Sequence, residues 1–299
     1  MKWSEAKKDY ENFLRLEKSL SNNSIVAYIN DINKLILFLD REYKKVPPEK
    51  VKVSHLNRFI EWINSQGVSP RTQARTISGI KSFYKFLLME EKITVAPTAM
   101  LESPKVGKKL PDILSIEEID LLINSVDISK PEGLRNRAIL ETLYSCGLRV
   151  SELVELKISD LFLSKNYIKV EGKGGKERLV PISGNAIDEI EKYINEYRNN
   201  LKINNADKNI LFLNRRGSQL SRVMVFTIVR NLAQEVGLDK KISPHTFRHS
   251  FATHLVNGGA DLRAVQEMLG HESILTTEIY THLDSEYLRS TVNQYHPQS

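Results

Sequence analysis

The residues best suited to carry out chemistry lie in a segment rich in histidine and arginine. The run HTFRH places His245 and Arg248 three residues apart, so both lie on one face of a helix. Phe247, Phe251 and Leu255 share another face, which is apolar and should be buried. A buried face fixes the helix, and its polar face then presents side chains to a site in a defined orientation.

A metal site is the first alternative for this segment. His245 and His249 have the i,i+4 spacing of two zinc ligands on a helix. The glutamate that a metalloprotease helix carries between them is missing, and Arg248 occupies the interval instead. An arginine that points into the same site would repel a dication. The sequence therefore disfavours a metal ion, and we expect no cofactor.

Phosphate chemistry fits the same residues better. Arginine carries a permanently charged, planar guanidinium that matches two phosphate oxygens. Arg149 is a second such residue, and Glu152, three residues later in GLRVSEL, could hold its guanidinium in place. Lys173 lies in GKGGKER, at the tip of a predicted turn where glycines allow a close approach of the backbone. Taken singly, each of these could be an ordinary surface residue.

A tyrosine in a notable context follows further along the chain. The segment LGHES contains His271, and ILTTEIYTH then places Tyr280 nine residues later. A tyrosine hydroxyl has an unperturbed pKa of about 10, so it needs a base or local positive charge before it can attack phosphorus. Fixed cations aimed at the phosphate oxygens also stabilise the charge that attack creates, at about 3–4 kcal/mol for each donor. A lone tyrosine is usually structural, but this one follows two arginines, a lysine and two histidines that suit phosphate chemistry.

The elements that must position these groups are predicted to be mostly helical. Ser115 and Glu118 form a capping box, and Gly147 ends an apolar helix that contains Cys146, the single cysteine, which we expect to be buried and unreactive. Asp261 caps a short helix that ends near Gly270. Helices are predicted at residues 135–146, 187–197, 222–236 and 244–258, and strands at 167–170 and 178–181.

The first third of the chain has a different character. Residues 1–110 carry 20 Lys and Arg against 12 Asp and Glu, whereas residues 111–299 carry 23 against 25. Helices are predicted at 23–40 and from Ser69-Pro70 onward, and the second presents a cationic face formed by Arg71, Arg75 and Lys85. Such a face could lie along DNA phosphates or be an ordinary solvent face.

Length and composition suggest two domains in a chain of 299 residues. We expect a helical, basic domain at 1–96 that could bind a polyanion such as DNA, a linker at 97–110 that is rich in proline and lysine, and a second domain at 111–299 that carries the candidate site. No apolar run is long enough to cross a membrane, and the N-terminus lacks the apolar stretch of a secretory signal. The expected location is the cytoplasm, with no insertion into a membrane.

The blocks GLRVSEL, GKGGKER, HTFRHSFATHL, LGHES and TTEIYTH, in this order, resemble the signature blocks of the tyrosine recombinase family, also called the phage integrase family. The likeness covers residues 111–299. The first third resembles the helical, SAM-like core-binding domain of that family more weakly, and the closing helix after Asp284 is similar to that of the bacterial Xer site-specific recombinases. The resemblance implies a mainly α fold with a small antiparallel β-sheet, which forms a C-shaped DNA clamp.

The resemblance also implies roles for single residues. Arg149 and Arg248 would bind the non-bridging oxygens of the scissile phosphate, and Lys173 would protonate the leaving 5′-oxygen. Tyr280 would be the nucleophile and form a 3′-phosphotyrosine. The full implied set is Arg149, Lys173, His245, Arg248, His271 and Tyr280 as catalytic residues, Glu152 as their support, and Arg71, Arg75 and Lys85 as DNA contacts.

In that set, His245 would orient the phosphate and assist removal of the tyrosine proton, and His271 would donate a further hydrogen bond. Strand exchange through a Holliday junction would require a homo- or heterotetramer on a double-stranded recombination site. A second Xer-type recombinase and an activating DNA translocase are possible partners. The closing helix has an apolar face that looks too small for a core, and we expect it to dock on a neighbouring subunit; this face comprises Leu283, Tyr287, Leu288 and Val292.

Resolution of chromosome dimers at cell division is the first functional hypothesis. A transposon or phage-type integrase would use the same chemistry. A type IB topoisomerase would use it too, but as a monomer and without a choice of sequence. A DNA-binding regulator without catalytic activity is disfavoured, because all six catalytic positions are filled.

Overall fold

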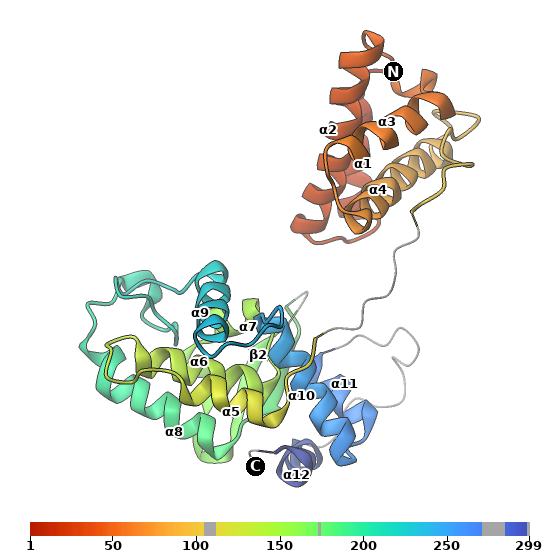
Figure 1. Cartoon of the computed structure of the whole chain (residues 1–299). Coiled ribbons are helices and arrows are strands. Elements are labelled where there is room, and N and C mark those ends of the chain that lie inside the picture. Colours follow the sequence, from red (N-terminus) through yellow and green to blue (C-terminus); the bar gives the residue numbers. More distant parts are fainter. Residues whose placement is uncertain (105–111, 173–174, 271–284, 298–299) are drawn as a thin grey trace. The chain divides into compact units, whose positions relative to one another are not determined.

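The computed structural model describes residues 1–104, 112–172, 175–270 and 285–297. The chain divides into two compact units, Met1–Lys109 and Leu110–Ser299 (Figure 1). Each unit has a hydrophobic core of its own. In the described part of the chain, no helix is both long enough and apolar enough to cross a membrane.

The N-terminal unit is built from helices. They are α1 (Trp3–Leu16), α2 (Asn22–Tyr43), α3 (Val53–Ser65) and α4 (Pro70–Met89). The predicted start of α4 is confirmed, because the Ser69 hydroxyl accepts a hydrogen bond from the Thr72 N–H at 3.3 Å and Pro70 occupies the first turn. Leu101 is buried in this core, so packed residues continue into the segment 97–110 for which the sequence predicts a linker.

An ion pair between a buried carboxylate and a partly exposed arginine joins α2 to α4. The Asp31 carboxylate, only 1% exposed, accepts two hydrogen bonds of 2.8 Å from the Arg75 guanidinium and one of 3.1 Å from the Thr76 hydroxyl. Gly79 lets the helices approach, because a Cβ at that position would lie 2.8 Å from the Asp31 Oδ2. Arg71, Arg75 and Lys85 are all exposed on this unit.

The C-terminal unit is also mainly helical. Its helices are α5 (Ile116–Asn124), α6 (Gly133–Cys146), α7 (Val150–Glu155), α8 (Gly184–Lys192), α9 (Arg222–Glu235), α10 (Pro244–Gly258), α11 (Leu262–Leu269) and α12 (Ser285–Tyr295). Its strands are β1 (Leu161–Phe162), β2 (Tyr167–Glu171) and β3 (Glu177–Pro181), which form an antiparallel sheet in the order β1-β2-β3. The predicted fold class is thus confirmed. The strand β1 was not predicted, because two residues are too short to show an alternating pattern.

Helix α6 is the centre of the unit and packs against α5, α8 and α10 (Figure 1). Nearly its entire circumference is buried, which explains its apolar composition. Cys146 is fully buried at its end, as predicted, and burial raises the pKa of the thiol to about 12. Gly147 ends the helix in the left-handed conformation, with φ at +57°. The chain then turns directly into the segment that carries Arg149.

Helix α12 packs on its own unit. Leu288 and Val292 are 5% and 2% exposed and belong to the same core as α6 and α10. Leu288 and Val292, on the face that the sequence predicts to dock on a neighbouring subunit, are thus covered within this chain, where α12 rests on α10, α11 and β3. Leu283 and the side chain of Tyr287 lie outside the described residues.

Candidate active site

The first arginine of the site is held by the start of a short helix. Arg149 is the N-cap of α7, and Glu152 occupies the third helical position after it. The Glu152 carboxylate accepts a hydrogen bond of 2.8 Å from the Arg149 backbone N–H and another of 2.8 Å from its Nη1. The contact between Glu152 and Arg149 that the sequence predicts is therefore present. A second nitrogen of the guanidinium, Nη2, donates to the Gly270 carbonyl at 3.3 Å.

The second arginine comes from α10. Phe247, Phe251 and Leu255 are completely buried, as predicted, and they fix this helix in the core. The Arg248 guanidinium lies on the adjacent face, where it donates to the Gly147 carbonyl at 2.8 Å and to the Leu269 carbonyl. Its Nη1 is also 3.8 Å from the Glu152 Oε2.

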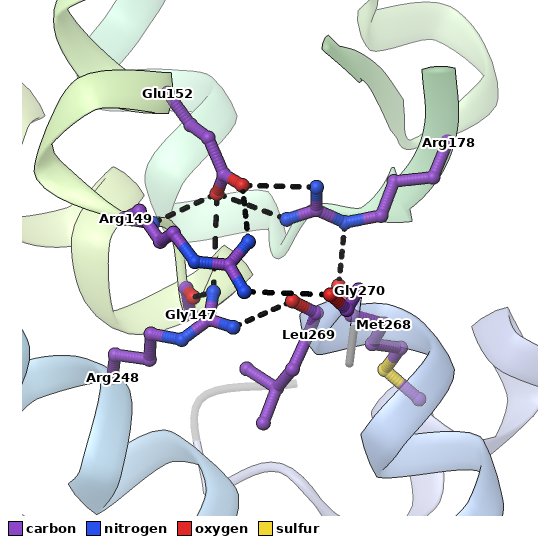
Figure 2. Close-up of polar contacts among 8 residues, drawn as sticks. All are labelled: Gly147, Arg149, Glu152, Arg178, Arg248, Met268, Leu269 and Gly270. Carbon is purple, nitrogen blue, oxygen red and sulfur yellow. Dashed lines mark hydrogen bonds and ion pairs between the residues drawn. The ribbon is translucent and has the colours of Figure 1, made fainter. Parts of the chain in front are cut away.

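A third arginine, missing from the predicted set, completes the group. Arg178 on β3 donates from Nη1 and Nη2 to the two oxygens of Glu152, at 3.0 and 2.9 Å. Its Nε donates to the Met268 carbonyl at 2.8 Å. Strand alternation could have revealed it, because Arg178 shares a face of β3 with the buried Val180. Figure 2 shows Glu152 between Arg149 and Arg178, with Arg248 beside them.

The charges of this cluster are unbalanced. Burial alone would raise the pKa of Glu152, but the hydrogen bonds and charges of Arg178 and Arg149 outweigh burial and hold the pKa below its ordinary value. Burial and the positive charges of Arg149 and Arg178 lower the pKa of Arg248 to about 10, against a partial compensation by Glu152. Arg248 therefore remains charged at neutral pH, and three guanidiniums share one ionised carboxylate. The excess positive charge is suited to binding an anion.

Part of that positive charge faces outward. The side chain of Arg149 is 34% exposed, whereas those of Arg248 and Glu152 are 7% and 4% exposed. Within the described residues, the Arg149 guanidinium uses two of the roughly five N–H donors that an arginine has. An approaching phosphate could therefore accept hydrogen bonds from Arg149 without breaking its bond to Glu152.

His245 lies on the same helix as Arg248, at the surface. Its ring centroid is 6.4 Å from that of Phe226 on α9. Partial burial lowers the pKa of His245, and the neighbouring His249, Arg248 and Arg149 lower it further through their charges. The imidazole is therefore neutral at physiological pH and has a nitrogen that can accept a proton.

The remaining predicted catalytic residues, Lys173, His271 and Tyr280, lie outside the described residues. The glycines that precede two of them in the sequence, Gly172 and Gly270, are described, and both lie against the Arg178 guanidinium. No group of three or more His, Cys, Asp or Glu that could hold a metal ion occurs in the described ranges.

Models of two protein families match the chain. The model described as "Phage integrase family" matches residues 113–286, and the model described as "Phage integrase, N-terminal SAM-like domain" matches residues 8–91. The chain belongs to the phage integrase family, that is, to the tyrosine recombinases. Both units described above are thus units of this family, and the arginine cluster lies in the region that the first model matches.

Relatives match nearly the whole chain. The tyrosine recombinase XerD of Listeria innocua is 40% identical over 291 residues, which are 97% of this chain and 98% of the relative. The tyrosine recombinase XerD of Chlorobaculum tepidum is 41% identical over 298 residues, covering 99% and 97%. The resemblance to the Xer recombinases that the sequence suggested is confirmed.

Solved structures agree with this assignment. The XerH site-specific recombinase in a post-cleavage complex with a palindromic difH substrate is 25% identical, with a TM-score of 0.72, and the match covers 96% of this chain and 84% of that one. The integrase of the transposon Tn1549 in complex with transposon right-end DNA shares the fold, with a TM-score of 0.74, 19% identity and coverage of 96% and 98%.

Proposed function

We propose that this recombinase cuts and rejoins DNA through a 3′-phosphotyrosine at Tyr280, and that the arginine cluster around Glu152 binds the scissile phosphate. The observation that carries the proposal is the convergence of Arg149 and Arg248 on one carboxylate, with an excess of positive charge beside an exposed surface. The family membership supports the same chemistry.

The arrangement suits the transition state better than the ground state. A phosphodiester carries one negative charge, and attack by an oxygen nucleophile adds further charge to the non-bridging oxygens. Guanidiniums that are already held in place by Glu152 and by main-chain carbonyls need not reorganise as that charge develops, which is the condition for strong electrostatic catalysis. Arg149 and Arg248 would supply this stabilisation.

Proton transfer would fall to other residues. His245 is neutral at physiological pH and could take the Tyr280 proton as the bond to phosphorus forms. Lys173 would protonate the leaving 5′-oxygen, and His271 would donate a hydrogen bond to the phosphate. The bond broken is the one between phosphorus and the 5′-oxygen, and the bond formed is the phosphotyrosine ester. Religation reverses both steps, so neither ATP nor a metal would be consumed.

The N-terminal unit would bind the flanking duplex. Arg71, Arg75 and Lys85 are exposed along α4, and Arg75 keeps about half of its side chain at the surface although two of its nitrogens bond to Asp31. Contacts from these residues to phosphates would make binding dependent on salt. We also propose that both units bind the same duplex.

The biological task that we propose is the resolution of chromosome dimers at cell division, in the cytoplasm. The support is the near full-length similarity to several XerD proteins. The active form would be a tetramer on DNA, made either of four copies of this chain or of this chain and a second Xer-type recombinase. A DNA translocase could activate it. In such an assembly α12, which rests on its own unit here, would have to exchange its place for a site on a neighbour.

A nicked suicide duplex tests the chemistry. In this substrate the short fragment released by cleavage diffuses away, so the covalent complex accumulates and can be seen on a denaturing gel. We expect a covalent band with the wild-type protein, also in the presence of EDTA, and none with Tyr280→Phe. A band of equal intensity from Tyr280→Phe would contradict the proposed nucleophile, and loss of the band in EDTA would indicate a metal-dependent reaction.

A further inference from the structure

Arg178 lies beside the Glu152 carboxylate and is largely buried. Its side chain is 14% exposed, against 34% for Arg149. Its two terminal nitrogens donate one hydrogen bond to each carboxylate oxygen, a bidentate geometry that the planar guanidinium of arginine matches. Arg149 and Arg248 approach the same carboxylate from other directions (Figure 2). The position of Glu152, and hence of the Arg149 guanidinium, therefore depends on Arg178.

The same guanidinium ties three separate segments together. Its Nε bonds the Met268 carbonyl at the end of α11, while its own backbone lies in β3. A Cβ on Gly270 would lie 3.2 Å from its Nη1, and a Cβ on Gly172 would lie 3.3 Å from the same atom. Both glycines thus leave room for Arg178, and Gly270 has a φ of +63° that also favours glycine.

We propose that Arg178 is a positioning residue for DNA cleavage: it fixes the Glu152 carboxylate, and through it the guanidiniums that face the scissile phosphate. The inference rests on the proposed phosphate-binding role of Arg149 and Arg248. Arg178 has little exposed surface of its own, so it acts through Glu152 and not by contact with DNA. Its positive charge also keeps Glu152 ionised against the cost of burial.

A substrate without charge at the scissile position tests this role. In a methylphosphonate, a methyl group replaces one non-bridging oxygen and the linkage is neutral, so cleavage depends less on oriented positive charge. The full-length protein is tested on a nicked suicide duplex with either linkage. We expect Arg178→Met to slow cleavage of the phosphodiester by about 10²-fold. Cleavage of the methylphosphonate should slow by less than about tenfold, since one such donor matters less there.

A matched control comes from the same hairpin. Lys169 on β2 pairs with Glu177 and Asp160 at 3.0 and 3.4 Å but does not contact Glu152 in the described structure. Lys169→Met removes both of these ion pairs and should leave the ratio of the two cleavage rates unchanged. If Arg178→Met does not fold, Arg178→Lys decides, because lysine keeps the charge but cannot bond both carboxylate oxygens and the carbonyl together. Arg178→Lys should also slow cleavage of the phosphodiester more than that of the methylphosphonate, but by a smaller factor than Arg178→Met.

Equal slowing of both linkages would overturn the proposal, since that is the effect of a general loss of folded protein. An unchanged phosphodiester rate would overturn it as well. Arg149→Ala separates this result from a failure of the proposed function. If Arg149→Ala loses phosphodiester cleavage selectively while the Arg178 variants do not, only the role of Arg178 is wrong. If Arg149→Ala cleaves normally, the phosphate-binding assignment itself fails.

Discussion

Each unit of the molecule contains a buried carboxylate bonded to a partly exposed arginine, but the two groups differ in their charge balance. In the N-terminal unit, Asp31 accepts hydrogen bonds from Arg75 and from a threonine hydroxyl, so one positive charge balances one negative charge. In the C-terminal unit, Glu152 receives Arg149 and Arg178 and lies 3.8 Å from Arg248. One carboxylate there is the counter-charge for three guanidinium groups.

This difference separates an ion pair that fixes two helices from a cluster with positive charge left over for catalysis. Arg75 gives both ends of its guanidinium to Asp31, and the result is a fixed distance between α2 and α4. Glu152 cannot neutralise its three partners, so it orients them and leaves a surplus of positive charge for a ligand. The exposed fractions of Arg75 and Arg149, 47% and 34%, are similar, so exposure alone would not have distinguished them.

Removal of each partly exposed arginine gives the largest expected contrast. We expect Arg149→Ala to slow formation of the covalent complex by about 10²–10³-fold, because one fixed donor to the transition-state oxygens is worth about 3–4 kcal/mol. Arg75→Ala should weaken DNA binding and lower stability, yet leave the cleavage rate of bound DNA unchanged. Single-turnover cleavage at saturating protein measures this. A similar slowing in both variants would mean that the N-terminal pair also takes part in catalysis.

Removal of each negative charge should give a smaller contrast. Glu152→Gln leaves buried guanidiniums without their counter-charge, and we expect it to lower the free energy of unfolding around α7 by about 3 kcal/mol. Asp31→Asn should cost about 1 kcal/mol, because Arg75 can turn toward water and an amide still accepts a hydrogen bond. Hydrogen exchange in α7 and in α2 measures the two losses separately. Equal losses would show that the surplus charge of the cluster does not matter for stability.

Local patterns in the sequence predicted much of the fold. The caps at Ser69, Ser115 and Asp261 are where the sequence places them, because a capping residue bonds to a backbone N–H within three residues. The buried face of α10 followed from its helical spacing in the same way. The strand β1 was missed, since two residues carry no period.

The site could be predicted only in part. Arg149 and Glu152 are three residues apart, so their contact is local and follows from helix geometry. The bond between Arg178 and Glu152 spans 26 residues, and it depends on the way in which β3 packs beside α7. The packing of α12 on its own unit is also a tertiary contact, and the apolar pattern of a helix does not indicate which surface will cover it. Charge pairing across such separations has no local signal.

A third buried carboxylate sharpens the comparison further. Glu141 on α6 is 4% exposed, and its Oε2 has no hydrogen-bond partner among the described residues. Burial raises the pKa of Glu141 from an ordinary value of 4.5 to about 7, and the charge of Glu189 adds to the effect, while Arg137 only partly opposes it. Glu152 is equally buried, yet its pKa is lowered. The bonded guanidiniums account for the difference.

The raised pKa predicts a pH dependence of stability. Between pH 4.5 and about 7 the folded protein keeps a proton on Glu141 that the unfolded chain releases, so this contribution is fully present at low pH and is lost as the pH rises through 7. We expect Glu141→Gln, which cannot ionise, to unfold like the wild type near pH 4 and to be more stable by about 2–3 kcal/mol at pH 8. Urea unfolding of both proteins across this range gives the difference, in which the titration of other groups cancels. A difference in stability that stays constant with pH would show that the charge of Arg137 is enough to keep the buried Glu141 carboxylate ionised. The bonded arginines would then not explain why the pKa of Glu152 is lowered.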